Sequence, residues 1–266
     1  MPFTISHVAA VLPFSRYLKA RQMLAAAVIG SMAPDFGIFL PWWHLLRAET
    51  HARFALVTFI LPAGLASYWL FQFAIKPAMQ AVLPDKAYQL ARPFAAAADI
   101  RKWRAWLLAA AGILLGALTH LLWDAFTHEG ARGMRMIPAL DELLLVVGSH
   151  HVAGQRLLQD VSSLVGFVII GWWIAWGLHR ETAPDTGSRP LGPAERATWI
   201  LVYGLMAVLG TIAALFLMHE AEPGRSALSS AANDAAVAGL RGLGFSLLVV
   251  SLVVDLRLRR RKPAQA

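Results

Sequence analysis

The chain has 266 residues, of which 58% are hydrophobic and 15% are charged, and its formal net charge is +8. Soluble domains have about 45–50% apolar and about 25% charged residues, so both departures indicate an integral membrane protein. The basic residues lie between apolar runs and in the tail Arg257–Lys262, so we expect membrane lipids and not nucleic acid as partners. The absence of cysteine excludes disulfides, thiolate zinc sites, iron–sulfur clusters and cysteine nucleophiles.

Apolar runs divide the chain into membrane segments. The longer runs are residues 22–40, 54–75, 104–127, 161–178, 198–218 and 236–256. Residues 2–14 form a shorter apolar segment that Pro13 breaks, and at about 1.5 Å per residue it cannot span a bilayer alone. Pro34 indicates that the helix in the first long run ends near Ala33. The predicted fold is an all-α polytopic membrane helical bundle, with about six spanning helices plus a short N-terminal helix.

The loops alternate in charge, and this alternation predicts the orientation of the chain. Lysine and arginine gather in segments 76–104 and 179–197 and in the C-terminal tail, whereas the intervening loops are less basic or contain offsetting acids. The positive-inside rule then makes the C-terminus cytoplasmic in a multi-pass protein of the cell inner membrane. We expect a membrane domain with the functional site at 1–180, a cytoplasmic linker at 181–197, and a C-terminal helix pair with a basic tail at 198–266.

Ionisable side chains recur at the end of the apolar run 104–127. His120, Asp124 and His128 follow at steps of four, so they share one face of a helix. Such groups inside a membrane helix are usually functional, although a polar stripe satisfied by other helices is the alternative. His120 and Asp124 can reach one zinc ion, which binds both ligand types at about 2.0–2.2 Å. In a straight helix His128 would lie about 12 Å from His120 along the axis, so the two cannot share one ion. His128 therefore binds a second metal, orients a ligand, or follows a helix that ends at Thr127.

The charge-based topology brings other candidates to the same membrane face. Asp35 ends the run 22–40 on its outer side, and His51 lies in the outer loop that follows. A hairpin of residues 7–19 and 22–35 would return His7 to the level of Asp35. Candidate ligands from three separate segments would then lie at one membrane face. The alternatives are that Asp35 ends a Pro-Asp turn, that His7 follows a helix cap, and that His51 is interfacial.

Three other features bear on the structure. Gly112 and Gly116 give the run 104–127 a GxxxG face for close helix packing. Asp141 and Glu142 precede an apolar stretch and are typical of the start of an amphipathic interfacial helix. Arg241 is the only other charge well inside a predicted span.

Three motifs are specific enough to compare with known families. Met1–His7, Ile29–Asp35 and Gly116–His128 together resemble an uncharacterised bacterial membrane family, domain of unknown function 4184, over about residues 1–180. More distantly, an early His, a Pro-Asp motif, a Thr-His pair and a later HxxxD are similar to those of inner-membrane metal-dependent hydrolases, some described as LexA-binding. More distantly still, the order His, Asp, His, HxxxD, His is similar to that of zinc-dependent phospholipase C. Carried over by motif, this resemblance implies metal ligands at His7, Asp35, His51, His120, Asp124 and His128. The phospholipases build a trinuclear zinc site that needs a further HxxxE pair. Here His151 and Gln155 stand in its place, which favours one or two metal ions.

These resemblances imply a membrane metal-dependent hydrolase, and the loop charge predicts that its site faces the periplasm. Its cofactor would be one or two divalent ions, with zinc expected, and its substrate a phosphoester or lipid-related molecule. Asp124 or Asp35 would also act as the general base. Other classes stay open: a non-catalytic scaffold, an ion or proton transporter that uses the His/Asp stripe, or a bis-His haem protein. The oligomeric state is left open.

Overall fold

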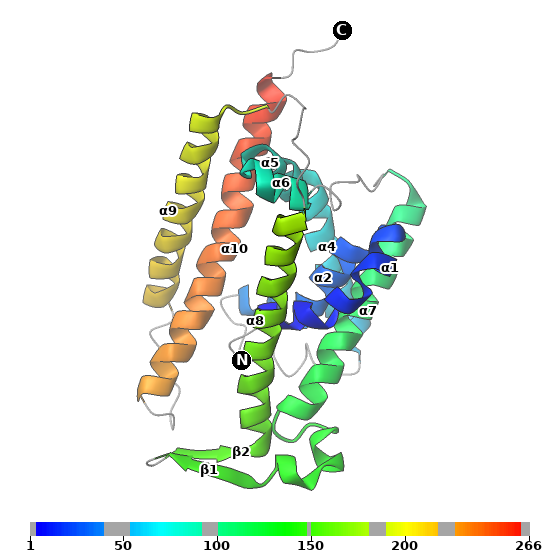
Figure 1. Cartoon of the computed structure of the whole chain (residues 1–266), viewed down its shortest axis with the longest axis vertical. Coiled ribbons are helices and arrows are strands. Elements are labelled where there is room, and N and C mark those ends of the chain that lie inside the picture. Colours follow the sequence, from blue (N-terminus) through cyan, green and yellow to red (C-terminus); the bar gives the residue numbers. More distant parts are fainter. Residues whose placement is uncertain are drawn as a thin grey trace.

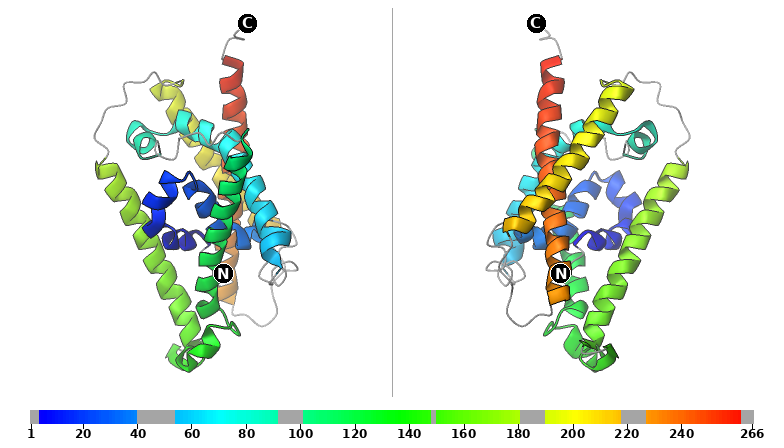
Figure 2. Two further views of the ribbon diagram at one scale, coloured as in Figure 1. Left: turned by 90° about the vertical axis from the view of Figure 1, so that its right-hand side faces the viewer. Right: turned by 90° about the vertical axis from the view of Figure 1, so that its left-hand side faces the viewer.

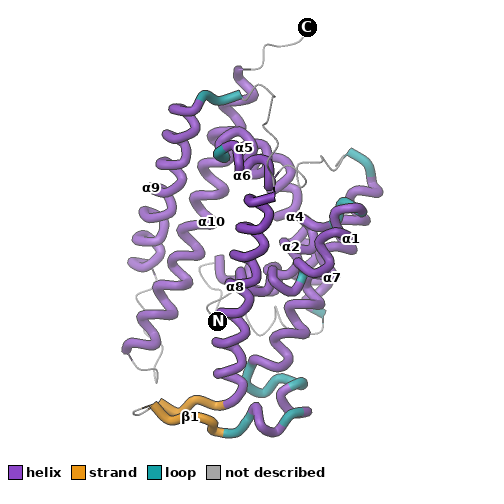
Figure 3. The backbone as a smooth tube through the Cα atoms, in the orientation of Figure 1, coloured by secondary structure: helices purple, strands orange, loops and turns teal. Residues whose placement is uncertain are grey.

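The structure is a computed structural model that describes residues 4–39, 54–91, 101–147, 150–180, 190–217 and 227–261 (Figure 1). Helices make up nearly all of these residues (Figure 3). The described helices long and apolar enough to cross a membrane are Leu56–Val82, Trp103–Thr127, Gly154–His179, Pro193–Leu217 and Asp234–Arg261. The predicted all-α membrane bundle is therefore confirmed. The expected span at 22–40 is instead a shorter apolar segment, Leu24–Phe39.

The N-terminal residues form the expected hairpin. Its first arm is η1 (Thr4–Ala10), η2 (Leu12–Phe14) and α1 (Ser15–Ala20), and its second is α2 (Leu24–Met32) followed by η3 (Ala33–Phe39). Gln22 makes the turn with a φ of 59°, just after the basic cluster Arg16–Arg21. The α-helix stops at Met32 as Pro34 predicts, but the chain continues as the 3-10 helix η3 rather than leaving the helical path.

The next span changes its helical pitch twice. It consists of η4 (Leu56–Ile60), α4 (Leu61–Leu70), η5 (Phe71–Ile75) and α5 (Lys76–Val82), and α6 (Asp85–Ala91) follows. The segments η4 and η5 are π-helical, and prolines at 62 and 77 follow them closely. Because proline has no N–H to donate, the backbone bonds upstream are displaced and the helix widens locally.

The long helices α7 (Trp103–Thr127) and α8 (Gly154–Arg180) are joined through η7 (Met134–Met136), η8 (Pro138–Leu140) and a hairpin of β1 (Leu143–Val147) and β2 (His150–Ala153). The expected interfacial helix after Asp141 is wrong. The strands pair antiparallel, with Val146 opposite His151. The β-branched Val146 and Val147, followed in the sequence by a Gly-Ser pair, favour a strand and a turn over a helix.

The last two spans, α9 (Pro193–Leu217) and α10 (Ala227–Arg261), pack along each other. The helix α9 begins at Pro193 rather than at 198, because proline fits the first turn of a helix. At this end Glu195 forms ion pairs with Arg257 and Arg261, at 3.1 and 2.9 Å. The pair also packs on α5 through a buried apolar cluster, Ala78, Ala81, Val82, Leu191, Val250 and Val254.

The arrangement of the spans separates two ends of the molecule. The helices α7 and α8 diverge from the β1–β2 hairpin, and the N-terminal segments lie between them (Figure 2). At the opposite end lie α5, α6, the start of α9 and the end of α10 (Figure 1). The basic segments that contain these elements therefore share one end, as the alternation of loop charge requires. Which end is cytoplasmic stays a prediction.

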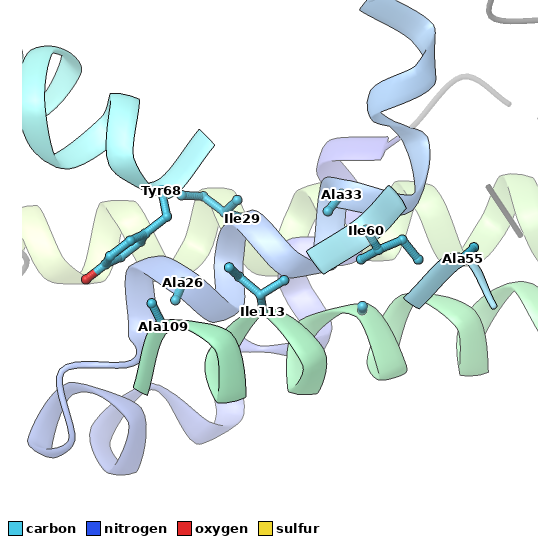
Figure 4. Close-up of a cluster of buried hydrophobic side chains, with 9 residues drawn as sticks. Ala26, Ile29, Ala33, Ala55, Ile60, Tyr68, Ala109 and Ile113 are labelled. Atoms are coloured by element: carbon cyan, nitrogen blue, oxygen red, sulfur yellow. The ribbon is translucent and has the colours of Figure 1, made fainter. Parts of the chain in front are cut away.

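Close backbone contact between α2 and α7 forms the seam on which the functional site is built. A Cβ placed on Gly116 would lie 2.0 Å from the carbonyl oxygen of Ala27, and one on Gly30 would lie 2.2 Å from that of Ile113. The predicted GxxxG packing face is thus confirmed. Figure 4 shows Ala26, Ala109 and Ile113 in the apolar cluster along this seam.

Candidate metal centre

Ionisable side chains from separate segments meet between η1, η3 and α7. His7 comes from η1, Asp35 from η3, and His120 and Asp124 from α7. Their exposed fractions are 8%, 6%, 0% and 7%, so all four are buried. The structure thus brings these four predicted ligands together in a buried cluster and places a fifth, His128, beside Asp124. The sixth, His51, lies outside the described residues.

The distances among these groups suit a single ion. His120 Nε2 lies 3.2 Å from Asp124 Oδ2 and 3.8 Å from Asp35 Oδ1, and His7 Nε2 lies 3.6 Å from Asp124 Oδ1. Ligand atoms of His7, His120 and Asp124 all lie within 4.8 Å of one another. A tetrahedral zinc ion with bonds of about 2.0–2.2 Å spaces its ligands by roughly 3.4 Å, so a small adjustment would place all three around it.

Neighbouring polar groups orient two of the candidate ligands. The carbonyl oxygen of Ser31 lies 2.7 Å from His120 Nδ1 and can only accept, so this nitrogen carries the proton. The lone pair of His120 is then on Nε2, the atom that faces the carboxylates. Thr4 Oγ1 donates to Asp35 Oδ2 at 2.8 Å. Such supporting hydrogen bonds are a regular feature of metal sites, because they hold the tautomer and the ring or carboxylate orientation.

His7 lies face to face with His120, and one of its ring nitrogens is buried without a hydrogen-bond partner. The two rings stack with centroids 3.8 Å apart, and Trp123 meets His7 edge-on at 5.3 Å. The Nδ1 atom of His7 is buried and makes no hydrogen bond. Burial first, and then the neighbouring His120, lowers the pKa of His7 to about 4. The ring is therefore neutral near pH 7, which is the form that binds a metal.

His128 reaches the site because the helix stops before it. The helix α7 ends at Thr127, and His128 is extended, with φ −113° and ψ 138°. Its Nδ1 lies 3.4 Å from Asp124 Oδ1, and 26% of its side chain is exposed. Of the alternatives that the spacing left open, the structure has the one in which the helix ends at Thr127. His128 lies at the rim of the cluster.

A small cavity opens beside the cluster toward α8. Its volume of about 20 Å³ is enough for a water molecule or an ion. Gln159 and Ser163 line it from α8, and Trp123 anchors that helix by donating from Nε1 to Ser162 Oγ at 3.1 Å. The sequence analysis did not predict that α8 lines the site. Its signal was the spacing of Gln155, Gln159 and Ser163 by four on one face of an apolar helix.

Gly166 sets how closely η1 approaches α8, and it supplies a test that touches no candidate ligand. A Cβ at Gly166 would lie 2.9 Å from the carbonyl oxygen of Ser6, the residue before His7. We expect Gly166→Ala to displace η1 and to weaken metal binding by about tenfold, measured by competition with a chelator. Gly171→Ala is the matched control, because open space surrounds that position on the same helix. Equal metal affinity in both variants would contradict the packing argument.

Comparison with known proteins identifies the family. No curated protein and no solved structure matches the chain. One family model, described as Domain of unknown function (DUF4184), matches residues 1–252. The match extends well beyond the three motifs and includes η1, η3 and α7, which carry the buried cluster. The chain therefore belongs to the DUF4184 family.

Proposed function

We propose that this protein is an integral membrane hydrolase that depends on a divalent metal, with zinc the expected ion. One observation carries the proposal: His7, His120 and Asp124 bring their ligand atoms within 4.8 Å of one another in a buried site. Asp35 adds a second carboxylate beside His120. Imidazole and carboxylate are ligand types that zinc uses in catalytic sites with three protein ligands and an open position.

The residues of the cluster divide into two roles in this proposal. His7, His120 and Asp124 would hold the ion, which when bound supplies a water of lowered pKa and polarises the scissile group. Asp35 would be the general base, because Thr4 holds its Oδ2 and leaves Oδ1 turned toward the cluster. His128 at the rim would contact the substrate or bind a second ion. Gln159 and Ser163 would hydrogen-bond the substrate from the α8 wall.

The proposed substrate is a phosphoester or lipid-related molecule, reached at the outer face of the cell inner membrane. The resemblance to metal-dependent hydrolases motivates the phosphoester. The orientation rests on loop charge, which predicts that the basic end and the C-terminus are cytoplasmic. No lysine or arginine is among the described residues that line the cavity, so the metal would have to neutralise a phosphate. The position of the site among apolar spans supports a substrate delivered from the bilayer.

Two other classes of function receive less support from the geometry. A bis-His haem needs two imidazoles on opposite faces of the iron, whereas His7 and His120 stack directly on each other. A transporter needs a polar path to the other face. Toward the basic end, the described part of the α2–α7 seam is packed with buried apolar side chains such as Ala26, Ala109 and Ile113. These observations favour a closed binding site over a conducting path.

Metal content tests the first part of the proposal. We expect wild-type protein, purified at neutral pH without chelators, to carry stoichiometric metal by mass spectrometry. His120→Ala should lower its affinity by more than a hundredfold, since even supporting residues cost about 10–100-fold. His179→Ala is the matched control, because it lies near the far end of α8. A wild-type protein that carries no metal would contradict the proposal.

Hydrolysis tests the second part separately. Metal-loaded protein is assayed with a chromogenic phosphodiester and with a fluorescent phospholipid in vesicles. The proposal expects turnover that disappears with a chelator and with Asp35→Asn, the variant that removes the general base. A protein that binds metal but hydrolyses neither probe would limit the proposal to metal binding.

A further inference from the structure

Arg241 lies in the last spanning helix and contacts the segment that carries Asp35. Its Nε donates a 2.7 Å hydrogen bond to the carbonyl oxygen of Ile38, which is 203 residues away in the sequence. The helix around it is apolar enough to cross the membrane. A charged side chain inside a span is costly and is usually retained for function. The contact therefore calls for an explanation beyond packing.

The last described turn of η3 supplies a partner for this cation. Ile38 lies in that turn, and its carbonyl oxygen accepts the hydrogen bond from Arg241. A charged side chain inside a span pairs with backbone carbonyls or other polar groups of the protein, because lipid offers it no partner. The side chain of Arg241 is partly buried, so this contact gives its charge a partner within the protein.

A second contact holds η3 against α10. Gly244 lies one turn further along α10, on the face of Arg241, and a Cβ there would lie 2.6 Å from Cε1 of Phe39. The helix α10 is itself braced by α9, because Ser246 Oγ donates to the carbonyl oxygen of Tyr203 at 2.6 Å. The end of η3 is therefore clamped by a hydrogen bond and by a close ring contact from a supported helix.

This clamp lies one turn of the 3-10 helix from Asp35. Ile38 lies three positions after Asp35, and residues at that spacing lie above one another in η3. On its other side Asp35 is held by Thr4, and its Oδ1 lies 3.8 Å from His120 Nε2. A shift or rotation of the end of η3 would therefore move the Asp35 carboxylate relative to the other ligands.

We propose that Arg241 is a positioning residue for Asp35, through which the C-terminal helix pair maintains the geometry of the metal centre. The inference rests on the proposed metal site. It assigns α9 and α10 a part in the site, although neither contributes a side chain to the buried cluster among the described residues.

Cobalt binding to the full-length protein tests this role. The visible spectrum of bound Co²⁺ reports the geometry of its ligands, which a loss of stability alone does not change. We expect Arg241→Met to weaken Co²⁺ binding by about tenfold and to alter the spectrum. Arg241→Lys, which keeps the charge and a donor, should restore most of the affinity. Arg260→Met is the matched control, because this arginine is exposed near the end of the same helix.

A glycine variant tests the contact between α10 and η3 without removing the charge of Arg241. Gly244→Ala presses on Phe39 and should alter the cobalt spectrum, whereas Gly239→Ala, which faces open space on α10, should not. If Arg241→Met does not fold, this pair decides the outcome. A folded Arg241→Met, or Gly244→Ala, with the affinity and spectrum of wild type would overturn the inference.

A readout that needs no metal separates this inference from the proposed function. The chain has no cysteine, so Ile38→Cys introduces a single thiol at a position that is 3% exposed. Arg241→Met should raise its rate of modification by a maleimide at least tenfold, and Arg260→Met should not. If the wild-type protein binds no metal, the proposed function is wrong. The rate of maleimide modification then still tests whether Arg241 holds η3. An unchanged rate would refute the clamp.

Discussion

Asp124→Asn is expected to abolish metal binding while leaving the fold intact. A single carboxylate faces three imidazoles, with Oδ2 3.2 Å from His120 Nε2 and Oδ1 3.6 Å from His7 and 3.4 Å from His128. Asparagine has the same shape, so no cavity is created. It loses the negative charge, and it directs an NH₂ group toward nitrogens that would otherwise share a cation. We expect metal affinity to fall by more than a hundredfold, because a ligand matters more than its supports.

The loss should also appear in thermal stability. A metal present at a hundred times its Kd stabilises the native state by about 2.7 kcal/mol. For a protein of this size that corresponds to roughly 5–10 °C in apparent Tm. Adding a chelator should therefore lower the Tm of wild type and leave that of Asp124→Asn unchanged. Metal-free wild type and Asp124→Asn should then unfold at similar temperatures.

Asp160→Asn is the matched control for this change. Asp160 lies on an exposed face of α8, where it pairs with Arg156 at 3.2 Å. This variant should keep both the metal and the chelator-dependent shift in Tm, since surface ion pairs contribute little to stability. If Asp124→Asn responded to the chelator as strongly as wild type, the metal would have to bind elsewhere.

The spans were predictable because a bilayer imposes a simple constraint. Only a long apolar helix satisfies its own backbone in lipid, so runs of hydrophobic residues locate the helices with little help from tertiary structure. The prediction was weaker where local chemistry changes the path. The segment 24–39 is apolar but short, and the residues after Asp141 form a hairpin. The π-helical segments before the prolines at 62 and 77 were not anticipated either.

The candidate ligands were predictable for a related reason. An ionisable group within an apolar run stands out, and loop charge placed Asp35 and the 120–128 stripe at one level of the membrane. The expected N-terminal hairpin then returned His7 to that level. Their supports could not be read in this way. Thr4 bonds Asp35 across 31 residues, and Ser31 accepts from His120 across 89. A threonine or a backbone carbonyl carries no such signal until the helices are packed.

The contact between α10 and η3 was likewise only partly predictable from the sequence. Arg241 was visible as a charge inside a span, but its partner is the backbone carbonyl of Ile38, 203 residues away in the sequence. The sequence therefore identified an unusual residue without its role. The role depends on which backbone carbonyl packs against α10, which is a property of the packed structure.

Gly116→Ala is expected to be among the most damaging single changes in the described residues. A Cβ at this position would lie 2.0 Å from the Ala27 carbonyl oxygen and 2.6 Å from the Ser31 nitrogen. Both are backbone atoms of α2, so no side-chain rotation relieves the contact, and the two helices must separate. We expect a loss of stability of about 3 kcal/mol, the upper part of the usual range for overpacking, measured by unfolding in detergent.

The same separation should reach the metal centre. Gly116 lies one turn before His120, and the carbonyl that orients His120 belongs to Ser31, one of the residues that the new Cβ would displace. Gly204→Ala is the control: Gly204 faces open space in α9, so alanine there should leave metal binding unchanged and stabilise the helix by up to about 1 kcal/mol. A Gly116→Ala protein with wild-type stability and metal affinity would show that the seam between α2 and α7 does not position the site. A loss of both, together with the opposite response at Gly204, would tie the helix packing and the metal centre to the same few backbone contacts.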